Sequence, residues 1–194
     1  MATCYNVNVV AGAVTTEPKG EISSYKPWDN TSALVSKILS MEIHSYITGF
    51  VDGEGCFSVS FSKRSKLNTG IEVRPSFSVS QHRRNKKIVL YLHSFFKCGG
   101  VRYSASDQNY KFEVRSLDDL VKIIIPHFEK YPLKTSKRTD FEAFREICLL
   151  MKRNQHRNLT GLKKIIQLSS KMNEAGKRNY SPQYLLSIID KMKV

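Results

Sequence analysis

The chain is organised around the segment Tyr46-Ile47-Thr48-Gly49-Phe50-Val51-Asp52-Gly53-Glu54-Gly55, and this segment is followed directly by Cys56-Phe57-Ser58-Val59-Ser60-Phe61. Its first half predicts a short helix, because Ile47, Phe50 and Val51 recur at helical spacing. Gly49 and Gly53 are four residues apart and therefore lie on one stripe of that helix. A stripe without side chains lets a second helix approach closely.

Two acids lie at the end of the predicted helix. Glu54 is the last side chain before Gly55 releases the chain into a strand, and Asp52 precedes it by two residues. A carboxylate in this place, beside a close pair of helices, could bind a metal ion where the two helices meet.

Two segments after the helix alternate between apolar and polar residues. In residues 56–63, apolar residues alternate with the serines Ser58, Ser60 and Ser62. A basic turn over residues 63–70 follows, and the alternation then returns with Ile71, Val73, Phe77 and Val79 on its apolar side. Each segment predicts a strand with one buried face and one polar face.

The rest of the chain predicts two more strands and several helices. A helical pattern over residues 84–97 ends at Gly99-Gly100, and strands are predicted over residues 101–105 and 110–114. A helix begins at Ser116 and is expected to end near Pro126, and later helices are predicted over residues 138–153, 159–173 and 181–192. This order predicts an α+β fold in which a four-stranded antiparallel sheet packs its apolar face on helices.

The charge of the chain is strongly positive and unevenly placed. The 194 residues carry a formal net charge of +14 and give a pI of about 9.7, whereas residues 1–40 hold as many acids as lysines. A basic folded body fits a polyanionic partner, most often nucleic acid. A membrane surface is the competing partner, but the only Trp, Trp28, lies in the neutral part, and no apolar run approaches the ~20 residues that span a bilayer.

The four cysteines are far apart and form no Cys-x-x-Cys pair. This spacing argues against a zinc finger and against a disulfide framework, so we expect reduced cysteines. The N-terminal segment carries acids and no Arg, and it has neither the composition of a mitochondrial transit peptide nor the order of a secretion signal.

Residues 47–55 resemble the LAGLIDADG motif of homing endonucleases, with Glu54 at the position of the family's metal-binding acid. Further segments resemble family landmarks and occur in the family's order: Phe77-Ser78-Val79-Ser80-Gln81-His82, Cys98-Gly99-Gly100-Val101, His127-Phe128-Glu129-Lys130-Tyr131-Pro132-Leu133 and Leu159-Thr160-Gly161-Leu162. The resemblance covers roughly residues 43–173, and residues 1–40 match nothing in it. It implies an αββαββα fold whose sheet forms a saddle on DNA.

The polar face of the sheet is the surface that the resemblance places on DNA. Solvation alone would explain a polar face, but short hydroxyls among long cations suit the major groove, where Arg reads guanine and Asn reads adenine. Arg83 and Arg84, which begin the helix after the second strand, are expected to hold phosphates. The other residues predicted to contact DNA are Ser58, Ser60, Ser62, Arg64, Lys66, Glu72, Arg74, Ser76, Ser78, Arg102, Ser104, Asn109, Lys111 and Lys134.

Phosphodiester hydrolysis needs a metal ion to polarise the phosphate, an activated water and stabilisation of the leaving oxygen. By resemblance, Glu54 and the backbone carbonyl of Gly53 bind Mg²⁺. Mn²⁺ is expected to substitute for Mg²⁺, and Ca²⁺ is expected to bind without supporting cleavage. Asp52 is expected to have a structural role at the helix end and is not placed on the metal.

Two further residues are candidates for catalysis by resemblance. Gln81, at the end of the second strand, would order water near the scissile phosphate, and purely local hydrogen bonding is the alternative. Lys137 is the first choice for the family's catalytic lysine and Lys134 the second, since some relatives place this lysine where the chain has Ser136. Both lysines could instead contact DNA phosphates only.

Only one copy of the motif is present, and one Glu54 centre can cut one strand. Cleavage of both strands then requires two chains, and the stripe of Gly49 and Gly53, together with Tyr46, supplies a self-complementary surface. We therefore predict a homodimeric, Mg²⁺-dependent homing endonuclease that acts on a long, nearly palindromic DNA site and is encoded by a mobile intron in a chloroplast or mitochondrion. Two alternatives stay open: an RNA maturase that assists splicing of its host intron, and a DNA-binding regulator that does not cleave.

The chain is expected to have three parts. Residues 1–40 form an irregular or partly disordered arm, with a short helix near residues 32–39. Residues 41–175 form the endonuclease domain, and residues 176–194 form a helical extension.

Overall fold

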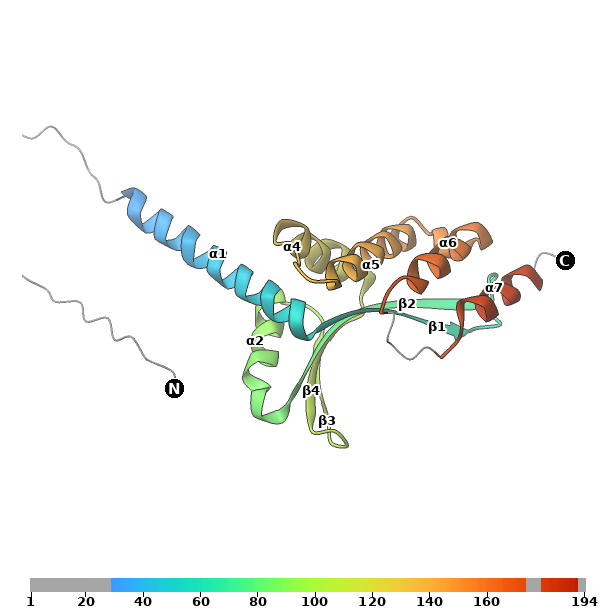
Figure 1. Cartoon of the computed structure of the whole chain (residues 1–194), viewed down its shortest axis with the longest axis horizontal. Coiled ribbons are helices and arrows are strands. Elements are labelled where there is room, and N and C mark those ends of the chain that lie inside the picture. The colour runs from blue at the N-terminus through green and yellow to red at the C-terminus, as the bar shows by residue number, and fades with distance from the viewer. Residues whose placement is uncertain (1–28, 174–178, 192–194) are drawn as a thin grey trace, which may run out of the picture. The chain divides into compact units, whose positions relative to one another are not determined.

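The computed structural model describes residues 29–173 and 179–191 of the chain (Figure 1). The chain divides into two units, Met1–Ile38 and Leu39–Val194. Of the first unit only residues 29–38 are described, and they form the first turns of helix α1 (Asp29–Glu54). No helix in the described ranges is both long and apolar enough to span a bilayer.

Four strands form one antiparallel sheet with the order β1-β2-β4-β3 (Figure 1). They are β1 (Gly55–Lys63), β2 (Ile71–His82), β3 (Gly100–Ser104) and β4 (Asn109–Val114). The register places Phe57 opposite Phe77 and Val79 opposite Phe112, so apolar side chains meet on one face of the sheet.

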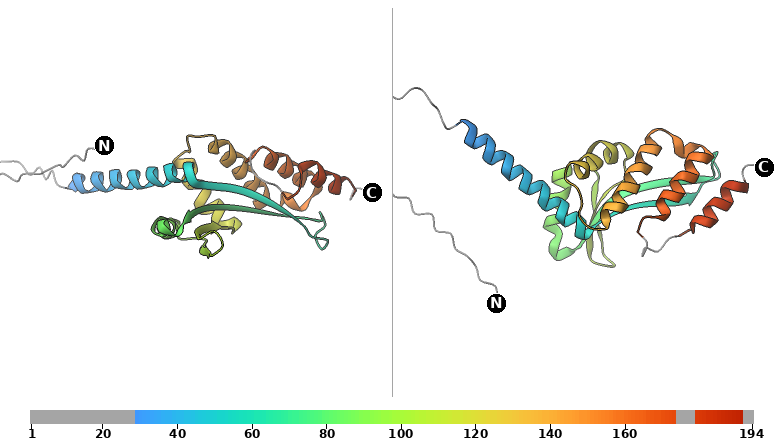
Figure 2. Two further views of the ribbon diagram at one scale, coloured as in Figure 1. Left: turned by 60° about the horizontal axis from the view of Figure 1, so that its bottom comes forward. Right: turned by 45° about the horizontal axis from the view of Figure 1, so that its top comes forward.

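Helices cover this apolar face. They are α2 (Lys86–Phe96), α3 (Leu117–Asp119), α4 (Ile125–Lys130), α5 (Lys137–Lys152), α6 (Leu159–Ser170) and α7 (Pro182–Lys191), with shorter turns η1 (Arg83–Asn85), η2 (Leu120–Ile124) and η3 (Gln155–Arg157). Helices α5 and α6 run along the same side of β1 and β2 (Figure 2). The centre of the core consists of aromatic rings that are at most 1% exposed, Phe57, Phe77, Phe112, Phe128 and Phe144.

The α+β fold, the αββαββα order and the four-stranded antiparallel sheet are confirmed. Each predicted strand and helix of residues 56–192 has a counterpart, and the differences lie at the ends: β2 continues to His82, and α6 ends at Ser170. The predicted boundaries at residues 40 and 175 stay predictions. Residues 1–28 of the predicted arm lie outside the described residues.

The motif helix is longer than we expected. The sequence led us to a short helix at the motif and an irregular arm before it, but α1 runs without a break from Asp29 to Glu54. The reason is local: no proline or glycine occurs between Asp29 and Gly49, so nothing in the backbone chemistry stops the helix there. The short helix predicted over residues 32–39 is part of α1.

Pro126 does not end the helix that begins after Ser116, contrary to our expectation. The chain passes from α3 through the π-helical turn η2 into α4, and Pro126 lies in the first turn of α4. In a regular helix a proline ring clashes with the carbonyl four residues earlier and removes one hydrogen bond. The wider turn, in which the Ile125 N–H bonds the Leu120 carbonyl, accommodates Pro126 and the helix continues.

Candidate active site

The candidate site lies where helix α1 passes into strand β1. Ile47 and Val51 are fully buried and fix the end of α1 on the core. At Gly55 the chain turns so tightly that a Cβ atom would lie 2.5 Å from Cγ1 of Val51 and 2.7 Å from its carbonyl oxygen. Only glycine fits this close approach, and the turn leaves the preceding Glu54 exposed.

Asp52 joins the loop before α5 to the end of α1. Its carboxylate accepts hydrogen bonds from the Lys134 N–H at 2.9 Å, from the Thr135 N–H at 3.1 Å and from Thr135 Oγ1 at 2.6 Å. Burial acts to raise the pKa of Asp52, but the bonds from Thr135 and Lys134 outweigh it and lower the pKa below its ordinary value. These contacts give Asp52 the structural role expected of it.

Glu54 is held by a hydrogen bond from strand β2. Gln81 Nε2 donates to Glu54 Oε2 at 2.8 Å, and Asn85 Nδ2 donates to Gln81 Oε1 at 2.9 Å. The pairing of Gly55 with Val79 brings the end of β2 beside the end of α1. The structure thus brings Glu54 and Gln81 together, and it adds Asn85, which we did not predict. The signal for Asn85 in the sequence is an Asn four residues after Gln81, at the start of a helix.

Lys137, at the start of α5, is the lysine that lies beside the motif. Its Nζ donates to the Gly55 carbonyl oxygen at 2.5 Å, and its backbone N–H donates to Thr135 Oγ1 at 3.2 Å. Lys134 takes part through its backbone N–H, which bonds Asp52, and the residue is exposed. The geometry favours the first of the two lysines proposed from the sequence.

Within residues 29–173 and 179–191, no group of three His, Cys, Asp or Glu side chains is arranged to hold a metal ion. Glu54 offers one exposed carboxylate, and the Gly53 carbonyl precedes it in the chain. Mg²⁺ prefers oxygen ligands, keeps several waters and is often completed by substrate phosphates. The residues present therefore fit a hard divalent cation that is shared with a phosphate.

Gly49 and Gly53 lie on a face of α1 that other described residues leave accessible. A Cβ atom built on either glycine would have no heavy atom of another described segment within 4 Å. Tyr46 is 57% exposed, and its ring stacks on Phe50 at a centroid distance of 6.4 Å. Tyr46, Gly49, Phe50 and Gly53 form what we call the open face of α1. All the residues predicted for a dimer interface lie on it.

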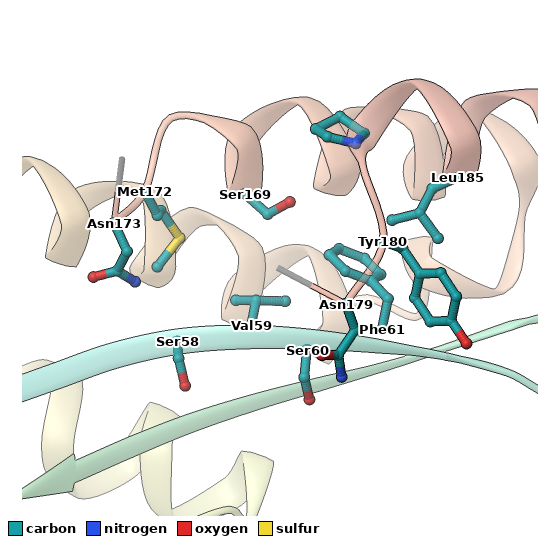
Figure 3. Close-up of a pocket in the computed structure, with 11 residues that line it drawn as sticks. Ser58, Val59, Ser60, Phe61, Ser169, Met172, Asn173, Asn179, Tyr180 and Leu185 are labelled. Atoms are coloured by element: carbon teal, nitrogen blue, oxygen red, sulfur yellow. The ribbon is translucent and has the colours of Figure 1, made fainter. Parts of the chain in front are cut away.

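The serines of β1 lie on the side of the sheet away from the helices. Figure 3 shows that Ser58 and Ser60 point to the opposite side of β1 from their apolar neighbours, as the alternation predicted. A hydrogen bond of 2.9 Å joins Ser58 Oγ to Ser76 Oγ across the strands, and Ser60 Oγ donates to the Arg74 carbonyl at 3.3 Å. The predicted polar face is therefore formed jointly by β1 and β2.

Glu72 forms ion pairs with two arginines on this face. Its Oε2 accepts from Arg74 Nη2 and Arg64 Nε, both at 2.8 Å, and from Ser62 Oγ at 3.2 Å. The hydrogen bonds from Arg74 and Arg64 lower the pKa of Glu72 below its ordinary value. The side chains of Arg64 and Arg74 stay 56% and 53% exposed, so both guanidinium groups can still reach a ligand.

Glu113 on β4 has a similar place. Lys111 Nζ lies 2.8 Å and Arg115 Nε 2.9 Å from its carboxylate, and Arg102 pairs with Lys111 in the register. Burial acts to raise the pKa of Glu113, but the hydrogen bond and charge of Lys111, with the charges of Arg115 and Arg102, lower it below its ordinary value. The face thus carries two carboxylate-centred groups of cations, which suits a polyanion.

Ser78 is the most buried residue of the predicted set. It is only 6% exposed and lies in the register between Cys56 and Glu113, and its contact with DNA stays a prediction. Alternation predicts the face of the sheet to which a side chain points, but it does not predict how much of that side chain the neighbouring strands bury. The other predicted residues not yet placed are all exposed or partly exposed: Lys66, Arg83, Arg84, Ser104 and Asn109.

A cavity of about 220 Å³ lies on the helical side of β1, at the end of α6 and the start of α7 (Figure 3). Met172, Tyr180 and Leu185 are among the residues that line it. Neither Glu54 nor Gln81 lines this cavity, so it is separate from the candidate site.

Comparison with known proteins gives one consistent family. The sequence profile of the LAGLIDADG endonuclease family matches residues 47–148. The "Probable intron-encoded endonuclease 2" of Neurospora crassa is 35% identical over 130 residues, which are 66% of this chain and 29% of that protein. The structure titled "Archaeal Intron-encoded Homing Endonuclease I-Vdi141I Complexed With DNA" is 29% identical with a TM-score of 0.73, over 79% of this chain and 98% of that one. The I-SmaMI LAGLIDADG homing endonuclease bound to cleaved DNA is 31% identical with a TM-score of 0.68, over 77% of this chain and 48% of that one.

The match includes the whole candidate site. The family profile covers more than half of the chain and begins at Ile47, the first residue of the motif that ends in Glu54 and Gly55. The chain spans less than two thirds of the length of the first curated relatives that it matches, between 25% and 52%. From the profile and the shared fold together, the chain belongs to the LAGLIDADG endonuclease family.

Proposed function

We propose that this chain is a site-specific DNA endonuclease that hydrolyses phosphodiester bonds and promotes the homing of its host intron. The observation that carries the proposal is the meeting of Glu54, Gln81 and Lys137 at the end of the motif helix. Phosphodiester hydrolysis requires a metal-binding carboxylate, a group that orders water and a cation near the developing charge. The names of the relatives, which are intron-encoded or DNA-bound endonucleases, support it.

Each residue of the site has a role in this proposal. Glu54 and the Gly53 carbonyl hold Mg²⁺, which polarises the scissile phosphate when bound; Mn²⁺ substitutes, and Ca²⁺ binds without supporting cleavage. Gln81 holds a water by its side-chain amide. Lys137, whose partly buried Nζ lies at the Gly55 carbonyl, stabilises the negative charge on the leaving oxygen.

The polar face of the sheet binds the duplex. Its cations neutralise phosphates, and the guanidinium groups of Arg64, Arg74 and Arg102 are of the kind that pairs with guanine in the major groove. Arg83 and Arg84, exposed at the end of β2, hold phosphates beside the site. Two exposed Arg groups that share Glu72 approach the duplex already oriented.

The active form is a homodimer. The chain matches nearly all of I-Vdi141I but only about half of I-SmaMI, so two copies are needed to equal the longer protein. The open face of α1 has room for a partner helix at Gly49 and Gly53. A two-fold pair presents one Glu54 to each DNA strand and favours a nearly palindromic target.

We place the gene in a mobile intron of a chloroplast or mitochondrion. The names of relatives support an intron origin. Sequencing the DNA around the gene tests this: it should lie inside an organellar intron, and a free-standing nuclear gene would contradict the placement.

The cleavage proposal is tested with a target selected in Ca²⁺ from random duplexes and cloned into a supercoiled plasmid. Wild type should linearise the plasmid in Mg²⁺. Glu54→Gln keeps the size of the side chain but removes the charge that holds the metal, so it should bind the target in Ca²⁺ and not cut it. Glu129→Gln, an acid on α4, is the matched control and should cut normally.

Two outcomes would count against the proposal. Normal nicking by Glu54→Gln would remove this residue from the mechanism. Specific binding by wild type without cleavage in Mg²⁺ or Mn²⁺ would leave a DNA-binding protein on the same fold.

A further inference from the structure

Asn85 stands at the N-cap of α2 but does not cap that helix. An N-cap Asn ordinarily accepts a hydrogen bond from a backbone N–H of the first turn, and few residues do so better. Asn158 does this for α6, where it accepts from the Gly161 N–H at 2.7 Å. The Asn85 side chain makes no such bond to the described first turn of α2 and donates to Gln81 instead.

Asn85 is the end of a row of three polar groups whose directions are fixed by their chemistry. Glu54 is a carboxylate and can only accept, so the atom of Gln81 that faces it at 2.8 Å must be Nε2. The Gln81 oxygen then faces Asn85, and the atom that meets it at 2.9 Å must be the donor Nδ2. Turning the Gln81 amide over would set two acceptors together at Glu54 and two donors together at Asn85.

We propose that Asn85 is a positioning residue, which holds the Gln81 amide by its oxygen and so keeps Nε2 on Glu54. The proposal rests on the proposed role of Glu54 and Gln81 in DNA cleavage. It is supported by the position of Asn85 at the N-cap of α2, where its side chain makes no capping hydrogen bond and contacts Gln81 instead. Because Asn85 is exposed, its amide could have been solvated or bonded to the helix, and the geometry commits it to the site.

The proposal predicts a specific effect of Asn85→Ala. Held at one end only, the Gln81 side chain regains rotamers and spends less time at Glu54. The loss of one such hydrogen bond should slow single-turnover cleavage about three- to tenfold. DNA affinity in Ca²⁺ should stay unchanged, since in this proposal the Asn85 amide acts on Gln81. The melting temperature should also stay unchanged, since α2 loses no cap.

Two other variants separate positioning from structure. Asn158→Ala, the matched control, removes a real cap and should lower the melting temperature while leaving cleavage unchanged well below it. Gln81→Ala removes the group through which Asn85 acts, so the double variant should cleave no more slowly than Gln81→Ala alone. Additive losses, weaker DNA binding by Asn85→Ala, or a drop in its melting temperature equal to that of Asn158→Ala would each overturn the proposal.

A second measurement does not depend on cleavage. In protein without DNA or metal, nitrogen-detected NMR follows the exchange of the Gln81 side-chain NH₂ with solvent. Asn85→Ala should speed this exchange several-fold and Asn158→Ala should not; unchanged exchange in Asn85→Ala overturns positioning. Faster exchange in Asn85→Ala together with an inactive wild type would refute the proposed function alone and leave the positioning contact standing.

Discussion

Two carboxylates separated by a single glycine meet different surroundings at the end of α1. Asp52 is engaged by donors from Lys134 and Thr135, whereas the partner of the exposed Glu54 is the neutral amide of Gln81. A carboxylate that already satisfies several donors gains little from a metal ion, but one on an open edge can share a cation with a phosphate. The residue type alone does not distinguish the two acids; the loop that docks on one of them does.

A second feature at this scale is a pair of histidines between α1 and α4. His127 is 8% exposed, its Nε2 lies 3.2 Å from Thr48 Oγ1, and its ring centre lies 5.4 Å from that of His44. Burial, with a smaller effect of His44, lowers the pKa of His127 to about 4. Burial, with Lys130, also lowers the pKa of His44.

We expect the free energy of unfolding to fall as the pH is lowered from about 6.5 toward 4. The unfolded chain binds a proton near the ordinary pKa of 6.5, whereas folded His127 stays neutral until about 4. At pH 5 the loss from this one residue should be about 2 kcal/mol. Urea unfolding at pH 7 and pH 5 measures it, and His127→Gln, which can still bond Thr48, should show a smaller difference. Equal pH dependence of the two proteins would contradict the assignment.

At the scale of elements, strand β2 carries both halves of the site. Its start holds Glu72 and Arg74 on the polar face, its middle buries Phe77, and its end places Gln81 on Glu54. The strand period of two keeps reading groups and core groups on opposite faces. Under the proposed function, one strand therefore connects base reading with cleavage.

Glu72→Gln should relax DNA discrimination. The neutral amide no longer holds Arg64 and Arg74 by charge, so both side chains lose their common orientation. Affinity for the selected target should fall about three- to tenfold, while affinity for a scrambled duplex should stay level or rise, since one negative charge is gone. Titrations of both duplexes at one salt concentration measure the ratio of the two affinities.

Glu142→Gln, which removes the partner of Arg138 on α5, is the control. Equal changes on both duplexes would show that Glu72 acts only as a charge.

The elements that could be predicted are those whose burial is periodic. Strands β1 and β2 alternate because one face meets the core, and α5 and α6 repeat at helical spacing for the same reason. The N-terminal length of α1 and the passage through Pro126 were not predicted. Breakers such as proline act through the local hydrogen-bond pattern, and a π turn changes that pattern without leaving a clear signal in the sequence.

The site was predicted in part. Glu54, Gln81 and Lys137 came from the resemblance, and the structure places them together. Asn85 was missed because an Asn at a helix start is ordinarily a cap, and the burial of Ser78 was not predicted, since it lies between two neighbouring strands. Both points concern contacts between segments, which a pattern along one segment does not contain.

At the scale of the whole molecule, we expect a change on the open face of α1 to alter the pairing of two chains without altering the stability of one chain. A Cβ atom at Gly49 would have no heavy atom of another described segment within 4 Å. Gly49→Leu should therefore fold with nearly unchanged stability, yet push a partner helix away. Overpacking typically costs about 1–3 kcal/mol, and the clash occurs twice at a two-fold axis.

Sedimentation and plasmid cleavage measure this effect. Gly49→Leu should sediment mostly as a monomer, bind half-sites weakly and fail to linearise the plasmid. Ser40→Leu is the control and should behave as wild type, because Ser40 is exposed and lies nine residues before Gly49, on the opposite side of α1. A dimeric Gly49→Leu that linearises plasmid normally would show that α1 is not the interface.

The contacts that complete the site join distant parts of the chain. Lys137 meets Gly55, and Lys134 meets Asp52, across 82 positions in each case. Such contacts form late, because closing a long loop costs entropy before any contact is gained. A ribosome completes the motif and all four strands before it reaches α5, so a growing chain holds Glu54 without its lysine. Under the proposed function, a growing chain without α5 is harmless to the genome that encodes it, and the ability to cut arrives only once α5 has been made.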